Sequence, residues 1–342
     1  MHMLTPGDEE SLLMDIKEGI QYALYLGKQE GRFTEDEIRL DRIRLNKLQY
    51  IVNEDRDLGL TFGWFKYGPA PEDVTTDAGI ELGPRQGDEI DHLEETRLPS
   101  RDFLTTEAFA YYFLENLNGE FNEIVTTEGT KTYLEDFYKK YAPNDEYAAR
   151  FTDLYIESAR LQQTLDIIGN NKEWHDNSTE YYYELNRKFV PVSEELSKHE
   201  SLEHTREPLE EYRKLLTSII SEADAKEELS TPQQAFINNA IRKFYNTIWD
   251  FVAQELSLRT MRGDNVGELR PDVETNAEKY RDGLWKKELR SLKERRHSVD
   301  LEPDLEDIEE LDSEGNPGND GQTLSGELIE QVSTMGSEVI KE

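Results

Sequence analysis

The chain has 342 residues, with 74 Asp plus Glu against 39 Lys plus Arg, a formal net charge of −35, and no cysteine. This length is sufficient for one large domain or two ordinary ones with a buried core. The lack of cysteine excludes disulfides, thiolate metal sites and cysteine nucleophiles. The acidity argues against a general electrostatic attraction to phosphate backbones or anionic lipids.

The acidic charge is spread along the whole chain. Residues 300–342 hold 14 acidic residues and one basic residue, so the first 299 residues still carry a net charge of −22. Arginine outnumbers lysine, 21 to 18, as is typical of proteins from halophiles that accumulate salt. At about 1 M salt the Debye length is roughly 3 Å, which screens the self-repulsion of such a surface. We therefore expect a salt-adapted protein with a solvated acidic surface. Only for the tail is binding to a basic partner an alternative explanation of the acidity.

The first part of the chain shows apolar residues at helical spacing. Apolar spacing predicts a first helix over residues 11–29, and the capping box from Thr34 to Glu37 announces a second helical stretch over 38–52. Aromatic residues among glycines predict a short strand or hairpin over 58–67, closed by a turn at Gly68-Pro69. Residues 70–100 are predicted to be an irregular connection with one strand at 80–82.

The remainder of the chain has a helical pattern almost throughout. Helices are predicted over residues 105–117, 145–168, 177–189, 208–223, 232–258 and 273–296. They share no fixed repeat period, so an irregular bundle is expected rather than a solenoid. No stretch approaches 18 apolar residues and the first ten residues lack a signal pattern, which predicts a cytoplasmic protein without membrane contact.

Sequence motifs for catalysis are missing. The chain has no phosphate-binding Gly-rich loop, no Gly-x-Ser-x-Gly elbow and no His-Glu-x-x-His. His199 and His204 are five residues apart, on different helical faces, which does not suit a zinc pair. We therefore predict no catalytic residue, no metal and no cofactor. An enzyme with a carboxylate site stays open as a third class, because 74 acidic residues would hide such a pair.

Two basic clusters stand out from the acidic background. The first lies within residues 38–50 and consists of Arg39, Arg42, Arg44 and Lys47 against Asp41. The second lies within residues 281–296, where seven cations outweigh three anions; we single out Lys286, Lys287, Arg290 and Lys293. Both clusters are explained either by local charge balance or by contact with nucleic acid or an acidic protein. For the second, residues 300–314 could also fold back over it.

The first cluster leads into a motif that resembles a known family. Residues 44–52 (Arg-Leu-Asn-Lys-Leu-Gln-Tyr-Ile-Val) precede residues 62–69 (Phe-Gly-Trp-Phe-Lys-Tyr-Gly-Pro), with Lys66 among them. The pattern resembles the start of the YwgA-like and Panacea (SocA-like antitoxin) families. The likeness implies a winged-helix-like domain that regulates or neutralises partner proteins. As structure alone, the same residues can form a small core of Leu45, Leu48, Ile51, Trp64 and Tyr67, with Gly68-Pro69 as a turn.

Together these observations predict a mainly α protein. We expect a winged-helix-like domain with a small β element (residues 1–75), an irregular linker (76–102), a helical bundle (103–296) and a disordered acidic tail (297–342). A protein making 6 to 10 phosphate contacts loses roughly three to five powers of ten in DNA affinity between 50 and 200 mM salt, whereas apolar association does not. The leading prediction is thus a regulatory or assembly module that binds a protein, plausible in a defence or toxin–antitoxin-like system. DNA binding is the alternative, and homo-oligomerisation stays open.

Overall fold

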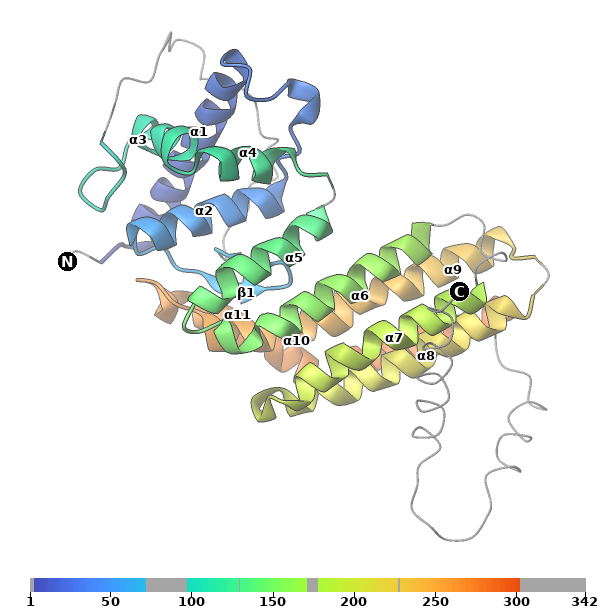
Figure 1. Ribbon diagram of the computed structural model, residues 1–342. Helices are drawn as coiled ribbons and strands as arrows, with labels where there is room; N and C mark the ends of the chain where they lie inside the picture. Colours follow the sequence, from blue (N-terminus) through green and yellow to red (C-terminus); the bar gives the residue numbers. More distant parts are fainter. Residues whose placement is uncertain (1–2, 72–96, 129, 171–177, 227, 302–342) are drawn as a thin grey trace. The chain divides into compact units, whose positions relative to one another are not determined.

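Helices dominate the structure. A computed structural model describes residues 3–71, 97–128, 130–170, 178–226 and 228–301 (Figure 1). Within these ranges the named strands form one two-stranded sheet, so the predicted mainly α class with a small β element is confirmed. The tail from residue 302 onward and the predicted strand at 80–82 lie outside the described residues.

The helical elements are α-helices joined by short 3₁₀ and π turns. The α-helices are α1 (Pro6–Gln29), α2 (Arg42–Arg56), α3 (Thr106–Tyr111), α4 (Asn118–Thr126), α5 (Thr130–Tyr141), α6 (Thr152–Asn170), α7 (Ser178–Ser197), α8 (Arg206–Asp224), α9 (Thr231–Lys243), α10 (Trp249–Thr260), α11 (Val266–Arg281) and α12 (Leu284–Ser298). Short 3₁₀ turns are η1 (Glu35–Glu37), η3 (Ala142–Asn144), η4 (Ala149–Phe151) and η5 (Glu200–Thr205), and π turns are η2 (Tyr112–Asn116) and η6 (Phe244–Ile248).

Four of the helices pack around one another in chain order. Helix α6 contacts α7, α7 contacts α8, α8 contacts α9, and α9 returns to α6, as the green-to-yellow helices of Figure 1 show. In α8 the buried positions Leu209, Tyr212, Leu216 and Ile219 recur at helical spacing, and this gives the helix one apolar face toward its neighbours. The bundle predicted from periodicity is therefore present.

The small sheet is a hairpin of β1 (Gly63–Phe65) and β2 (Gly68–Ala70), which pair antiparallel with Trp64 opposite Pro69. The two residues between the strands are Lys66 and Tyr67. The predicted turn at Gly68-Pro69 is wrong, because both residues belong to β2. Gly68 has a φ of +79°, which explains why a glycine begins the second strand immediately after a tight turn.

Several helix boundaries differ from the prediction. The stretch predicted as 232–258 is interrupted by the π turn η6, and the one predicted as 273–296 is divided into α11 and α12 at Gly283, where φ is +103°. The predicted helix at 145–168 begins at residue 152, after η3 and η4. Helices α4 and α5 were missed, and α12 continues two residues into the predicted tail.

A connection between distant segments lies beside the hairpin. The amide and carbonyl of Phe62 pair with those of Arg262 at 2.8 and 2.9 Å. The next residue, Gly263, has a φ of +129°, and an added Cβ would lie 2.3 Å from Cα of Thr61. Close backbone packing against residues 60–61 therefore requires glycine at position 263.

We expect Gly263→Ala to destabilise the protein by about 3 kcal/mol or more, because strain at φ adds to a backbone clash. The matched control is Gly267→Ala in α11, where a Cβ meets nothing within 4 Å. There alanine should stabilise by up to about 1 kcal/mol. Denaturant unfolding of both variants measures the difference, and equal effects would contradict the assignment.

Candidate functional site

The first basic cluster divides between the surface and the interior. Arg39 and Arg42 are exposed, whereas Arg44 and Lys47 are buried. Arg44 binds Asp41 at 2.9 Å and donates to the backbone oxygens of Arg39 and Thr127 at 2.6 and 2.7 Å. Two of the four residues predicted to contact DNA or a partner therefore serve the interior of the fold and offer no surface for docking.

Lys47 has an unusual environment for an ammonium group. Its side chain is 0% exposed, Nζ donates to the carbonyl of Pro69 at 2.9 Å, and it lies 5.3 Å from the ring centroid of Phe137. Burial lowers the pKa of Lys47 well below its usual range, and the attraction of Asp41 offsets this only in part. Lys47 thus fastens α2 to strand β2 rather than contacting a ligand.

The motif residues form a buried core around the hairpin. Leu48, Trp64, Gly68 and Pro69 are buried and Tyr67 is half-buried. Side chains from neighbouring helices bond to the hairpin backbone: Thr260 Oγ1 accepts from the Trp64 amide at 3.0 Å, the Tyr155 hydroxyl donates to the Trp64 carbonyl at 2.6 Å, and Trp249 Nε1 donates to the Lys66 carbonyl at 2.9 Å. These bonds satisfy the unpaired groups of a two-stranded sheet.

A single carboxylate, that of Asp145, lies at the centre of this core. One of its oxygens, Oδ2, accepts hydrogen bonds from Trp64 Nε1 at 2.7 Å, from the Tyr50 hydroxyl at 2.9 Å and from Arg262. The other oxygen accepts from the amides of residues 147 and 148. Arg262 also pairs with Glu54 at 2.5 Å. Because Asp145 is 0% exposed and fully bonded, this group is structural and has no open face for chemistry.

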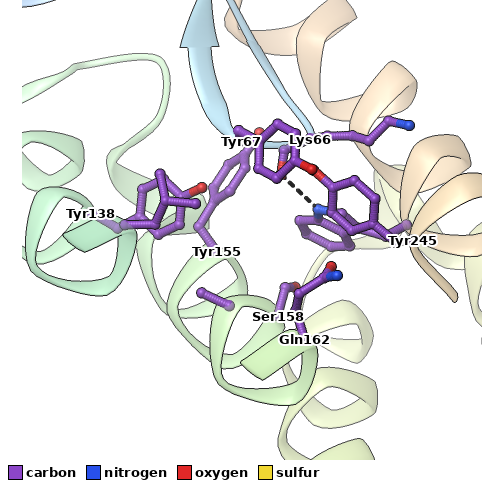
Figure 2. Close-up of a pocket in the computed structure, with 10 residues that line it drawn as sticks. Lys66, Tyr67, Tyr138, Tyr155, Ser158, Gln162 and Tyr245 are labelled. Atoms are coloured by element: carbon purple, nitrogen blue, oxygen red, sulfur yellow. Dashed lines mark hydrogen bonds between the residues drawn. The ribbon is translucent and has the colours of Figure 1, made fainter. Parts of the chain in front are cut away.

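A small cavity lies at the hairpin turn, whose residues Lys66 and Tyr67 belong to its lining. Figure 2 shows its lining of tyrosines with Ser158 and Gln162, and the rings of Tyr67 and Tyr245 are 4.8 Å apart. The nearby Lys66, from the sequence motif, pairs with Asp250 at 3.0 Å. The cavity volume is about 20 Å³, enough for one water molecule and too small for a substrate.

The second basic cluster lies at the surface. In α12 Trp285, Leu289 and Leu292 are buried, while Lys286, Lys287, Arg290 and Lys293 are exposed. Among the described residues, the ion pairs of Lys286 and Lys293 are long, at 3.7 Å, with Glu207 and Glu211. Lys287 and Arg290 form no ion pair with any residue that the structure describes. All four predicted residues of this cluster are therefore exposed in the part of the chain that the structure describes.

A cleft of about 540 Å³ opens beside the start of α12. Its lining consists of Ser201, His204, Glu207, Phe251, Arg259, Arg281, Trp285 and Lys286. Beneath it is the Glu255 carboxylate, which is 0% exposed. Glu255 bonds Arg281 Nε at 2.6 Å, Arg259 Nη1 at 2.8 Å and His204 Nε2 at 3.0 Å.

The charges around Glu255 are arranged as a fixed ion cluster. Burial alone would raise the pKa of Glu255, but the bonds from Arg281, Arg259 and His204 outweigh burial and lower it. The carboxylate therefore stays ionised and orients both guanidinium groups. The sequence prediction missed this site, because His204, Glu255 and Arg281 come from η5, α10 and α11, and only the pair of Glu255 with Arg259 lies within one helix.

The described residues hold no group of three or more histidine, aspartate or glutamate side chains suited to a metal ion. Among those same residues no helix is both long and apolar enough to cross a bilayer. Neither of the two cavities above is lined by paired buried carboxylates. The geometry that best suits ligand recognition is the cationic cleft with the adjoining face of α12.

Comparison with known proteins places the chain in a family. It belongs to the family described as "Domain of unknown function (DUF8098)", whose model matches residues 72–316. The match includes α3 to α12 and therefore the cleft, and it begins after the motif of residues 44–69. No curated protein and no solved structure matches the chain.

The environment of Lys47 predicts a pH dependence of stability. With its folded-state pKa below the ordinary 10.5, the unfolded chain binds one more proton between the two values. Stability should therefore rise with pH as the pH approaches 10.5 from below, by up to about 1.4 kcal/mol per pH unit. Lys47→Met should remove this contribution.

Urea unfolding at several pH values measures the effect. The control is Lys287→Met, an exposed lysine on α12, which should keep the slope of the unmodified protein. A Lys47→Met variant with an unchanged slope would show that Lys47 stays charged in the folded protein.

Proposed function

We propose that this protein is a regulatory or assembly module that binds an acidic protein partner through the exposed cationic face of α12. The observation that carries the proposal is the state of Lys287 and Arg290, which are exposed and form no ion pair with a described residue. Unpaired cations are unexpected in a chain with a net charge of −35 unless they serve a contact.

The geometry of α12 supports this role. Its buried stripe, with Trp285, Leu289 and Leu292, fixes the helix on the fold, and α12 contacts α8, α9 and α11. The cationic side chains consequently lie on a well-supported surface. A rigid helix costs less conformational entropy on binding than a loop.

The salt-adapted composition decides which kind of contact is effective. In concentrated salt, attraction beyond roughly 3 Å is screened, so charged groups act only through direct contact. A protein partner can combine such contacts with apolar packing, which salt strengthens. We therefore propose a cytoplasmic role in a salt-rich cell, where binding rests on short-range contacts.

The resemblance of residues 44–69 to the YwgA-like and Panacea families supports placement in a defence or toxin–antitoxin-like system. It also supports a winged-helix-like assignment for the N-terminal part. DNA binding is the second candidate, and with Arg44 and Lys47 buried it would rest on Arg39 and Arg42. Nothing in the described cavities favours an enzyme over these two.

The test is co-purification of the tagged protein from its source cells in about 2 M KCl, where long-range attraction is screened. The unmodified protein should retain a partner in fixed stoichiometry. The double variant Lys287→Glu/Arg290→Glu should lose it, because like charges then face the acidic surface.

The matched control is Arg39→Glu/Arg42→Glu, which reverses the same number of exposed arginine or lysine charges in the first cluster. This control should keep the partner. Retention by the α12 variant, or a DNA footprint that only the Arg39/Arg42 variant abolishes, would contradict the proposal and favour the DNA alternative.

A further inference from the structure

The cleft at α11 and α12 has hydrogen-bond donors that the fold leaves unused. Arg281 donates to Glu255 through Nε alone, and neither of its terminal Nη groups forms a hydrogen bond with a described residue. Its side chain is 39% exposed and lines the cleft. An arginine held at Nε with both Nη groups open presents a fork suited to a planar or tetrahedral oxyanion.

The helix break at Gly283 brings a second cation to the same place. In one continuous helix, Arg281 and Lys286 would lie five residues apart on different faces. The left-handed conformation of Gly283 ends α11 and redirects the chain into α12, so that both side chains line one cleft. Lys286 Nζ lies 5.0 Å from the ring centroid of Trp285, which supports the long side chain.

Bonds to Glu255 and Ser201 fix the arginine side chains that line the cleft. Glu255 fixes Arg281 and Arg259, and Arg259 Nη2 also donates to the carbonyl of Ser201 at 2.6 Å. Phe251 stacks on Tyr280 with ring centroids 5.3 Å apart, which adds an apolar wall. The donors are therefore oriented before any ligand arrives, and this lowers the entropic cost of binding.

The charge balance favours an anion. Arg259, Arg281 and Lys286 lie in the lining with one carboxylate, Glu207, which is 67% exposed at the rim. Glu255 lies outside the lining, and with Glu274 and Glu278 it attracts Arg281 from the protein side. A volume of about 540 Å³ lies within the range of small-molecule sites. Chloride in concentrated salt lacks the paired oxygens that an arginine fork recognises, so a phosphate or carboxylate group has the advantage.

We infer that this cleft is an oxyanion-binding site, which takes the phosphate or carboxylate group of a small ligand between Arg281 and Lys286. The site is distinct from the α12 face that binds a protein in the proposed function. It requires no partner protein, and it can be tested with residues that the partner experiment leaves unchanged.

The experiment is equilibrium dialysis of the full chain in about 2 M KCl, which screens nonspecific attraction. One arm uses labelled inorganic phosphate and the other labelled succinate. Saturable uptake of one anion per chain in either arm is the expected result, and the arm that saturates identifies the group. Uptake that fails to saturate in both arms would overturn the proposal.

Substitutions locate the site. Lys286→Gln should weaken binding about fivefold and Arg281→Lys about tenfold, since each loses a charged hydrogen bond. Lys287→Gln, one residue further along the same helix, should change affinity by less than about twofold. Equal weakening by Lys286→Gln and Lys287→Gln would overturn the inference, because general charge would then explain the uptake. Lys286 does not bond to Glu255, so Lys286→Gln leaves the buried ion cluster intact. This variant therefore tests the proposed site even if Arg281→Lys fails to fold.

Discussion

The Asp145 carboxylate is the contact on which the rest of the fold depends. Its hydrogen bonds join Tyr50 of α2, Trp64 of β1 and Arg262 after α10, which are separated by up to 212 residues. A buried charge is costly unless fully bonded, and the three side-chain donors here come from three different parts of the chain. The arrangement therefore requires the hairpin, α2 and the segment between α10 and α11 to form together.

The same principle explains where the cations lie. Arg44, Lys47 and Arg262 are drawn inside by backbone carbonyls and carboxylates, where they join elements. In α12 Lys286, Lys287, Arg290 and Lys293 are exposed, whereas Arg296 is buried and bonds to Ser218. In a strongly acidic chain, buried cations are thus those that join elements, and exposed cations are the candidates for binding. Both candidate sites include residues of α12.

Periodicity in the sequence was sufficient for the helical class, for the bundle helix α8 and for the presence of a hairpin near Trp64. It failed where long-range contacts decide the outcome. The basic residues of α2 have a local charge pattern similar to that of α12. Two of them, Arg44 and Lys47, are nevertheless buried, where they donate to the carbonyls of Thr127 and Pro69. The break at Gly283 was missed because apolar spacing continues across it. In the Glu255 cluster only the i,i+4 pair with Arg259 is local, while His204 and Arg281 are brought in by the fold.

The most direct test of this account is the stability of Asp145→Asn, measured by denaturant unfolding with fluorescence and circular dichroism together. Loss of the charge removes the ion pair with Arg262, which keeps its pair with Glu54, and weakens the buried hydrogen bonds from Trp64 and Tyr50. The account predicts a loss of about 3 kcal/mol in one cooperative transition. Asp136→Asn, at an exposed position with a 3.7 Å ion pair, should cost less than about 0.5 kcal/mol. A comparably small loss at Asp145, or separate transitions for the hairpin region and the bundle, would contradict the account.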